Sequence, residues 1–197
     1  NTGGMGTYAP APVLTDALRD AAMKTILEPM VAAMGKEGMP YVGCLYAGLM
    51  ITDEGPKVVE FNARFGDPET QVVLPLLDSD LGEIMMACAK GTLTSNMVKW
   101  KDSSAACVIL ASKGYPETSS KGDVISGDIK QYDTTIVFHS GTKLVGENYV
   151  TNGGRVLGVV GLGKDLRTAL DRAYERIEHI DFEGMQYRTD IGAKAFK

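Results

Sequence analysis

The chain has 197 residues, of which 44% are hydrophobic and 23% are charged, and its formal net charge at pH 7 is -5. This length gives room for one large domain or two small ones with a buried core. No apolar run approaches the roughly 20 residues of a membrane span, so no membrane role is expected. The negative charge, with no basic block, argues against a nucleic-acid partner, but a local cationic pocket for one phosphate stays possible.

The first predicted element is a helix over residues 14–34, because apolar residues recur there every four positions: Leu18, Ala22, Ile26, Met30 and Met34. Pro29 lies inside this pattern and removes an interior hydrogen bond. It predicts either a kink near Glu28 or two short helices in succession.

Two strand-like runs, residues 41–52 and 57–65, follow and are joined by a turn that contains Gly55 and Pro56. They predict a hairpin. Directly after the second run, Asp67-Pro68-Glu69 predicts a helix start, with Asp67 as the cap and Pro68 at the first helical position. Residues 80–90 predict a second amphipathic helix that ends before Gly91.

The second half of the chain changes character near residue 100. Short strand-like runs occupy residues 105–111, 135–140, 143–145, 149–151 and 155–160, and the turns between the last four predict an antiparallel meander. The closing helix, over residues 165–180, has a core-packing stripe of Leu166, Ala169, Leu170, Ala173, Ile177 and Ile180. We therefore expect two domains, residues 1–98 and residues 99–197.

The second arm of the hairpin carries an acid, an amide and a guanidinium at alternate positions. Side chains alternate between the two faces of a strand, so Glu60, Asn62 and Arg64 are expected on one face. A carboxylate and an amide oxygen suit a hard cation such as Mg²⁺, which keeps phosphate oxygens and waters in its other positions. Arg64 would supply a fixed positive charge for a transferring phosphate. The alternative to a metal site is an ordinary solvated strand face that binds no ligand.

The three cysteines, Cys44, Cys88 and Cys107, lie in apolar stretches without metal-ligand spacing. An odd number of cysteines and no secretion signal indicate reduced thiols and a cytoplasmic protein. The chain begins with Asn1 in a glycine-rich turn and not with Met. We therefore expect it to be part of a longer polypeptide.

Four motifs in this order carry a resemblance to a known family: residues 1–6 (NTGGMG), 59–71 (VEFNARFGDPETQ), 111–116 (ASKGYP) and 153–157 (GGRVL). They resemble the glycinamide ribonucleotide synthetases, also called phosphoribosylamine-glycine ligases, of the ATP-grasp superfamily. The resemblance runs through all 197 residues, and residues 187–192 also resemble the family's end.

The resemblance implies an α+β fold, in which the carboxy-terminal half of an ATP-grasp domain, an antiparallel sheet with helices, precedes a small, mixed, barrel-like α+β domain. It implies that ATP, glycine and 5-phosphoribosylamine give glycinamide ribonucleotide, ADP and phosphate through a glycyl phosphate. Glu60 and Asn62 would bind Mg²⁺ or Mn²⁺ between nucleotide phosphates, and Arg64 would stabilise the moving phosphoryl group. Because the preceding strand, residues 43–50, carries no acid, a second metal stays open.

The resemblance also implies that the amino-terminal half of the enzyme is absent, including the loop and lysine that cover the phosphates. The chain alone is then expected to be inactive, and a monomer is expected. Two rivals stay open: another ATP-grasp carboxylate-amine ligase or carboxylase, and a non-catalytic module that has kept the fold.

The remaining candidate residues are expected on the substrate side. The glycine-rich turn can present backbone N–H groups to an anion, but glycine-rich turns are mostly only turns. It is the family resemblance that makes Asn1, Thr2, Gly3 and Gly4 candidate substrate contacts. Asp67 and Glu69 are secondary candidates, because a cap and a first-turn acid already explain them. Lys113 and Arg155 are candidate cations for the ribose phosphate. His139 and Trp100 are expected to be structural.

Overall fold

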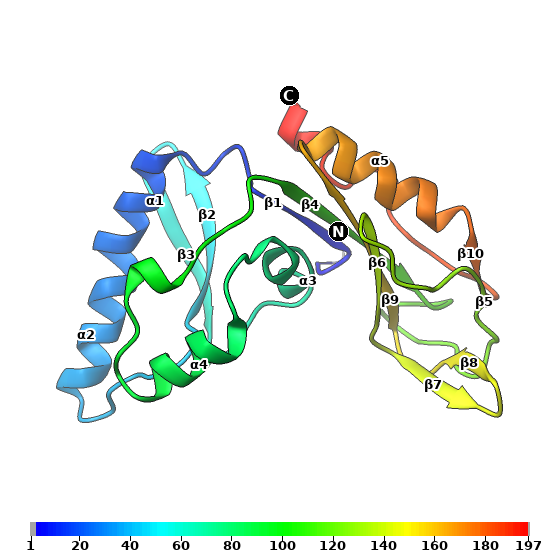
Figure 1. Cartoon of the computed structure of the whole chain (residues 1–197), viewed down its shortest axis with the longest axis horizontal. Coiled ribbons are helices and arrows are strands. Elements are labelled where there is room, and N and C mark those ends of the chain that lie inside the picture. Colours follow the sequence, from blue (N-terminus) through cyan, green and yellow to red (C-terminus); the bar gives the residue numbers. More distant parts are fainter. Residues whose placement is uncertain (1–2, 197) are drawn as a thin grey trace. The chain divides into compact units, whose positions relative to one another are not determined.

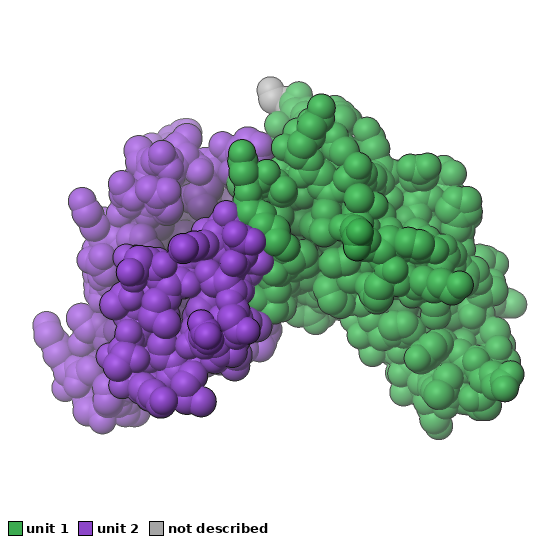
Figure 2. Space-filling view, viewed as in Figure 1, with its two compact units in different colours: residues 1–10, 67–76, 101–197 green, residues 11–66, 77–100 purple. Residues whose placement is uncertain are grey.

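The computed structural model describes residues 3–196, which belong to two compact units (Figures 1 and 2). Unit 1 consists of Asn1–Pro10, Asp67–Leu76 and Lys101–Lys197, and unit 2 consists of Ala11–Gly66 and Leu77–Trp100. The units thus interleave along the sequence. The division into residues 1–98 and 99–197 stays a prediction. Within the described part of the chain, no helix is both long enough and apolar enough to cross a membrane.

Unit 2 begins with a continuous helical run. The α-helices α1, Asp16–Ala22, and α2, Glu28–Lys36, are joined by a π-helical turn, Met23–Leu27. Pro29 lies in the first turn of α2, and the Glu28 N–H donates to the Met23 carbonyl five positions back. The wider turn accommodates the proline without a gap between the helices. The predicted interruption is therefore a local change of helix type.

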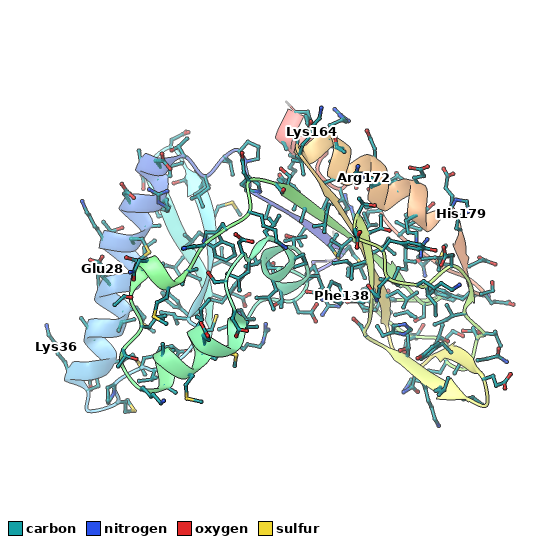
Figure 3. All side chains as sticks on the ribbon, in the orientation of Figure 1. Glu28, Lys36, Phe138, Lys164, Arg172 and His179 are labelled. Atoms are coloured by element: carbon teal, nitrogen blue, oxygen red, sulfur yellow. The ribbon has the colours of Figure 1, made fainter. Side chains whose placement is uncertain are left out.

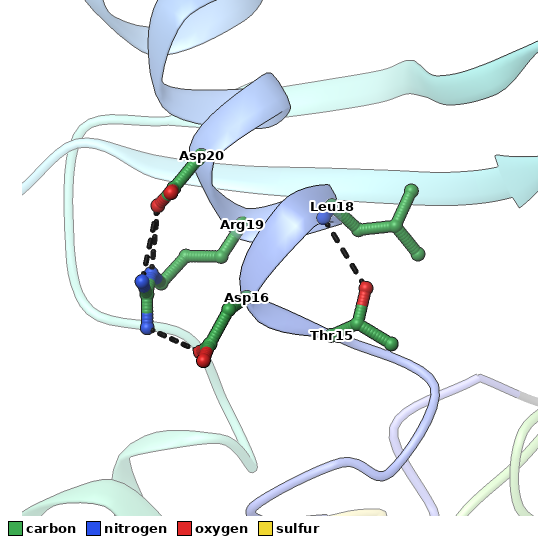
Figure 4. Close-up of polar contacts among 5 residues, drawn as sticks. All are labelled: Thr15, Asp16, Leu18, Arg19 and Asp20. Carbon is green, nitrogen blue, oxygen red and sulfur yellow. Dashed lines mark hydrogen bonds and ion pairs between the residues drawn. The ribbon is translucent and has the colours of Figure 1, made fainter.

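The start of α1 is fixed by side chains close in sequence (Figure 4). Thr15 caps the helix by accepting from the Leu18 N–H at 3.3 Å. The guanidinium of Arg19 pairs with Asp16 at 2.8 Å and with Asp20 at 3.0 Å. These ion pairs are exposed and contribute little stability, so the cap is the main signal that starts the helix here.

The predicted hairpin is present as β2, Tyr46–Thr52, and β3, Gly55–Asn62, which pair antiparallel. The register is irregular at one point: Gly48 lies opposite Glu60, while Leu49 lies opposite Val58. This bulge passes over Val59, and it precedes the part of β3 that carries the polar face.

Helix α4, Leu81–Ala89, completes unit 2 and confirms the second predicted helix. Asp80 caps it by accepting from the Glu83 N–H at 2.9 Å, and Gly91 follows with a positive φ of 68°. A short 3-10 turn, Ser95–Met97, follows.

Unit 2 buries little of its apolar surface. Among its described hydrophobic residues only Ala22 and Ala87 are buried, and large side chains such as Val42 (65% exposed) and Val59 (66% exposed) face solvent. Such exposed apolar surface is unusual for a unit that is stable by itself.

Unit 1 is built on an open four-stranded antiparallel sheet in the order β1-β4-β9-β6 (Figure 1). Its strands are β1, Gly6–Ala9; β4, Ser104–Ala111; β6, Thr135–His139; and β9, Arg155–Gly163. The α+β class with antiparallel sheets is confirmed, and the sheet is not a closed barrel.

The predicted meander is wrong. Strand β6 pairs directly with β9, whereas β7, Thr142–Val145, and β8, Asn148–Thr151, form a separate hairpin between them. The turn residues predicted correctly where the chain reverses, but a turn does not determine which strands pair across it. A third pairing joins β5, Ser126–Gly127, to β10, Ile180–Asp181.

Both faces of the central sheet are covered, which is why every residue of β4 is buried. Alternate residues of β4, such as Val108 and Leu110, pack in the cluster that contains residues of α5, Leu166–Ile177. The intervening ones, such as Cys107 and Ile109, pack with Val72 of the short helix α3, Thr70–Val73, and with Leu76 of the 3-10 turn Leu74–Leu76. The strand therefore reads as a continuous apolar run.

The predicted stripe of the closing helix is confirmed. Its buried residues include Leu166, Ala169, Leu170, Ala173 and Ile177, and Asp165 caps the helix by accepting from the Thr168 N–H at 2.7 Å. Ile180 lies beyond the helix, in β10. Arg172 of α5, labelled in Figure 3, donates through Nη1 to the Leu162 carbonyl of β9 at 2.5 Å and so ties helix to sheet.

A second arginine of α5 is buried in an ion pair. Arg176 is 8% exposed, and its guanidinium donates to Asp128 and, at 2.9 Å, to the Lys130 carbonyl. Tyr132 donates to the same Asp128 carboxylate at 2.8 Å. These donors, Arg176 above all, lower the pKa of Asp128 from 3.8 to about 2.

We expect this ion pair to make the unfolding free energy of unit 1 depend on pH in the acidic range. Because the pKa of Asp128 is lower in the folded state, its contribution is complete above about pH 4 and is lost as the pH falls towards about 2. Unfolding free energies of the wild type and of Asp128→Asn, measured by urea titration at several pH values, check this. The unfolding free energy of the wild type should exceed that of the variant above about pH 4, and this difference should disappear towards about pH 2. A difference that is constant down to about pH 2 would contradict the prediction.

Candidate functional site

The polar face of the hairpin lies on the last part of β3. Glu60 is exposed opposite Gly48, and Asn62 is half-buried opposite Tyr46. A Cβ atom on Gly48 would lie 3.1 Å from Cγ of Glu60, so the glycine leaves room for the acidic side chain across the hairpin. Both residues follow the bulge and are two positions apart in β3, which keeps them on one face.

Arg64 is not part of this strand. Strand β3 ends at Asn62, so the alternation that predicted Arg64 on the same face does not reach it. Its exposed guanidinium donates through Nη1 to the Phe65 carbonyl at 2.9 Å. The remaining nitrogens of Arg64 carry no further contact among the described residues. They are the donors with which Arg64 could bind an anion.

The donor set of this face suits a metal that shares its ligands with a substrate. Within the described part of the chain, no three His, Cys, Asp or Glu side chains gather into a metal cage. Glu60 and Asn62 offer two oxygen donors, which fits Mg²⁺ or Mn²⁺ held partly by phosphate oxygens and waters. Asn62 also lines an apolar pocket of about 180 Å³ with Met30, Met34 and Phe61.

Three predicted substrate residues of unit 1 meet in one hydrogen-bonded network. Arg155, at the start of β9, donates through Nη1 to the carbonyls of Gly4 and Asp67, both at 3.2 Å. Its Nη2 donates to Oδ2 of Asp67 at 2.8 Å. The guanidinium therefore joins segments that lie 151 and 88 positions away in the sequence.

Gly4 fits this network because it has no side chain. Its φ is +71°, and a Cβ atom there would lie 2.8 Å from Nη1 of Arg155. Any other residue would be strained and would have to displace the guanidinium. The structure therefore explains why one position of the glycine-rich turn, Gly4, is a glycine.

Asp67 is not the helix cap that the sequence predicts. Helix α3 begins at Thr70 after Glu69, with no side-chain cap, and the Asp67 carboxylate is used by Arg155 and by Gln71 Nε2, the latter at 3.0 Å. A cation from a distant strand thus replaces the local backbone N–H as its partner. Sequence reasoning missed Gln71, although its position four residues after Asp67 is a spacing at which helical side chains meet. Its Oε1 is buried without a hydrogen bond among the described residues.

The buried thiol of Cys107 lies close to this network. Burial, and then the Asp67 carboxylate, raise the pKa of Cys107 to about 12, while Arg155 opposes them. The thiol stays protonated at neutral pH and acts as a small apolar side chain. Cys44 and Cys88 are free and half-buried.

Lys113, Glu69 and His139 also belong to unit 1. Lys113 is exposed in the turn after β4, where its carbonyl accepts from Ser120 N–H at 3.1 Å, and Glu69 is half-buried in front of α3. His139 lies 3.0 Å from Thr142 through Nδ1, and loss of hydration lowers its pKa. Asn1 and Thr2 lie outside the described residues.

Comparisons with known proteins agree with the four sequence motifs at residues 1–6, 59–71, 111–116 and 153–157. The family model Phosphoribosylglycinamide synthetase, ATP-grasp (A) domain, matches residues 1–70, and the model Phosphoribosylglycinamide synthetase, C domain, matches residues 105–194. The chain belongs to the phosphoribosylglycinamide synthetase family.

Curated members of the phosphoribosylglycinamide synthetase family are similar over the whole chain. A phosphoribosylamine--glycine ligase from Synechocystis sp. is 51% identical over 99% of this chain and 47% of its own length. Another, from Caulobacter vibrioides, is 52% identical over 100% of this chain and 47% of its own length. The trifunctional purine biosynthetic protein adenosine-3 of Gallus gallus is 51% identical over 99% of this chain and 20% of its own length. The chain spans about half the length of the first two relatives.

Solved structures extend the likeness to the fold. A phosphoribosylamine--glycine ligase from Thermotoga maritima matches 96% of this chain and 46% of its own chain, with a TM-score of 0.84 and 34% identity. A biotin carboxylase from Campylobacter jejuni matches 96% of this chain and 44% of its own with a TM-score of 0.69, but at 13% identity it shows a shared fold only. The family assignment expected from the four motifs is confirmed.

Proposed function

We propose that this chain takes part in the ATP-dependent ligation of glycine to 5-phosphoribosylamine, which gives glycinamide ribonucleotide, ADP and phosphate. The observation that carries the proposal is the pair of oxygen donors, Glu60 and Asn62, on one face of β3 in a chain that is about 50% identical to enzymes named for this reaction. Rival ATP-grasp structures share the fold at far lower identity.

The chemistry assigns a task to each donor. The glycine carboxylate is a poor electrophile, so ATP first converts it to an acyl phosphate, which the ribosylamine nitrogen then attacks. Glu60 and Asn62 would hold Mg²⁺ or Mn²⁺, which neutralises charge on the nucleotide phosphates. The remaining donors of Arg64 would bind the phosphoryl group as charge develops on it. Arg64 is therefore the proposed catalytic residue.

The substrate side is proposed to lie in unit 1. Its candidates remain Asn1, Thr2, Gly3, Gly4, Asp67, Glu69, Lys113 and Arg155. Arg155, Gly4 and Asp67 form one hydrogen-bonded network, so a change at any of them displaces the others. This network supports a joint role of the three residues in substrate binding. Of the two candidate cations, Lys113 is exposed and Arg155 is half-buried.

The activity is proposed to need further polypeptide. The curated relatives are about twice as long as this chain, and unit 2 leaves side chains such as Val42 and Val59 exposed. The region that precedes the matched half of the relatives is the proposed cover for this surface. We further propose a cytoplasmic monomer that binds small molecules and neither nucleic acid nor membranes.

An assay of a chimera tests this function. In it, the amino-terminal half of the Synechocystis relative precedes residue 1, and the complete relative is the positive control. We expect ADP release that needs both glycine and phosphoribosylamine, while the 197-residue chain alone releases none. Release that depends on bicarbonate or on another carboxylate in place of glycine would favour the rival ligases and carboxylases. A folded chimera that releases no ADP with any of them would favour a non-catalytic module.

A further inference from the structure

The turn between β8 and β9 carries a residue pair that occurs once in the sequence. Asn152 is followed by Gly153, whereas every other asparagine, and every aspartate, is followed by a residue with a side chain. Because glycine has no side chain, its backbone nitrogen is not screened from the side-chain amide of the residue before it. Such a pair is the place where an asparagine side chain can react with its own backbone.

The structure leaves both reacting groups available. Asn152 is exposed, and its side chain makes no hydrogen bond or ion pair with any described residue. The N–H group of Gly153 donates no hydrogen bond within the same part of the chain. The pair also lies outside the strands, since β8 ends at Thr151 and β9 begins at Arg155. No strand hydrogen bond has to break for the Gly153 nitrogen to turn toward the Asn152 side chain.

The two ends of this turn are held in place by other segments. Thr151 is 1% exposed, and both its hydroxyl and its N–H donate to Asp123, each at 2.9 Å. At the other end, the Arg155 carbonyl accepts from the Gly141 N–H at 2.9 Å. The turn therefore has a fixed span.

Close packing along the turn leaves its backbone little room to move. A Cβ atom on Gly141 would lie 2.8 Å from Cα of Gly153, and a Cβ atom on Gly154 would lie 2.3 Å from Cδ2 of Tyr115. The Gly154 carbonyl also accepts from the Ser112 N–H at 2.8 Å. An added backbone atom in this turn would disturb these contacts.

We propose that Asn152 and Gly153 form a site of spontaneous deamidation and isomerisation. The Gly153 nitrogen bonds to Cγ of Asn152 and the bond from Cγ to the amide nitrogen breaks. The amide leaves as ammonia, with the proton that the Gly153 nitrogen gives up. Water then opens the cyclic imide, at Cγ to give aspartate or at the main-chain carbonyl to give isoaspartate, whose backbone runs through Cβ. Nothing is oxidised or reduced.

Isoaspartate changes the turn in two ways. It lengthens the main chain by the Cβ atom, which the held and packed turn accommodates only if Gly154 or Arg155 moves. It also adds a carboxylate three positions before Arg155, whose guanidinium binds Asp67 and the Gly4 carbonyl. The modification therefore loosens this network as the protein ages. It needs no ATP, metal or substrate, so it does not rest on the proposed function.

Storage of the folded 197-residue chain in mildly alkaline buffer, followed by trypsin digestion and mass spectrometry, tests the site. Cleavage after Lys143 and Arg155 gives a peptide, residues 144–155, that contains both Asn152 and Asn148. Asn148 is equally exposed but is followed by Tyr149, so it is an internal control. Ammonia should be lost at Asn152, faster at higher pH, and not measurably at Asn148. A chain digested without storage gives the background.

Two variants separate the added backbone atom from the added charge. Asn152→Gln keeps an amide but moves it one carbon further from the backbone, so this chain should stay unmodified during the same storage. Asn152→Asp supplies the carboxylate with a normal backbone. Hydrogen exchange at the N–H groups of Ser112 and Gly141, which hold the turn, should be faster in the isoaspartate form, purified by chromatography, than in either variant.

Ammonia loss at Asn152 that is no faster than at Asn148 would overturn the modification site. Exchange at Ser112 and Gly141 that is the same in the isoaspartate form and in Asn152→Gln would overturn the effect on the network. Neither measurement uses the ligase assay, so failure of this inference and failure of the proposed function are distinguishable.

Discussion

Glu60→Gln in the chimera is expected to reduce glycine-dependent ADP release by about 1,000-fold. The carboxylate is the one charged metal ligand proposed on β3, and metal stabilisation of a phosphoryl transition state is worth several kcal/mol, at about 1.4 kcal/mol for each factor of ten. Asn62→Ala removes a neutral oxygen donor and should act in the same direction with a smaller loss. Steady-state ADP release at saturating ATP and glycine measures both.

A control in the same hairpin separates a metal role from a general effect of charge. Glu54 is an exposed acid in the turn, paired with Lys57 at 2.9 Å, and Glu54→Gln should leave the rate nearly unchanged. The Glu60 and Asn62 variants should also need more Mg²⁺ or Mn²⁺ for half-maximal rate. A Glu60→Gln enzyme with the wild-type rate and metal dependence would refute the metal site on β3.

Gly161→Ala is expected to destabilise unit 1 strongly. A Cβ atom at this position of β9 would lie 2.0 Å from the carbonyl oxygen of Ala169 and 2.7 Å from the backbone nitrogen of Ala173, both on α5. These are backbone atoms, so helix and sheet must move apart and the core between them is lost. We expect destabilisation of about 3 kcal/mol, at the upper end for overpacking. Urea titration followed by circular dichroism measures it.

Gly35→Ala provides the matched comparison for this substitution. Gly35 lies in α2 with open space around it, so alanine should be neutral or stabilise the chain by up to about 1 kcal/mol through helix propensity. If Gly161→Ala unfolds at the same urea concentration as the wild type, the close packing of α5 on β9 is refuted.

Sequence reasoning succeeded for elements defined by neighbouring residues. The helices predicted over residues 80–90 and 165–180 and the apolar stripe of α5 depend on contacts three or four positions apart, and these elements appear as expected. It failed where partners are distant. The pairing of β6 with β9, in place of a meander, depends on the energy of a whole sheet, which no turn residue encodes.

The same distinction applies to the candidate site. Alternation along one strand was enough to group Glu60 with Asn62, but the strand ends before Arg64, and no local pattern indicates where it ends. Asp67 had a plausible local role as a cap, yet its carboxylate pairs with Arg155, 88 positions later.

The interleaving of the two units limits how this chain can be divided by gene fragmentation or recombination. Residues 101–197 supply most of unit 1, but β1, the edge partner of β4, and the apolar residues Val72 and Leu76 come from earlier in the chain. A gene fragment that begins at residue 101 would encode a sheet with an unpaired edge and one uncovered apolar face. Recombination within this region would therefore tend to break a core, so the segment from β1 to α5 is expected to pass between polypeptides as a single block.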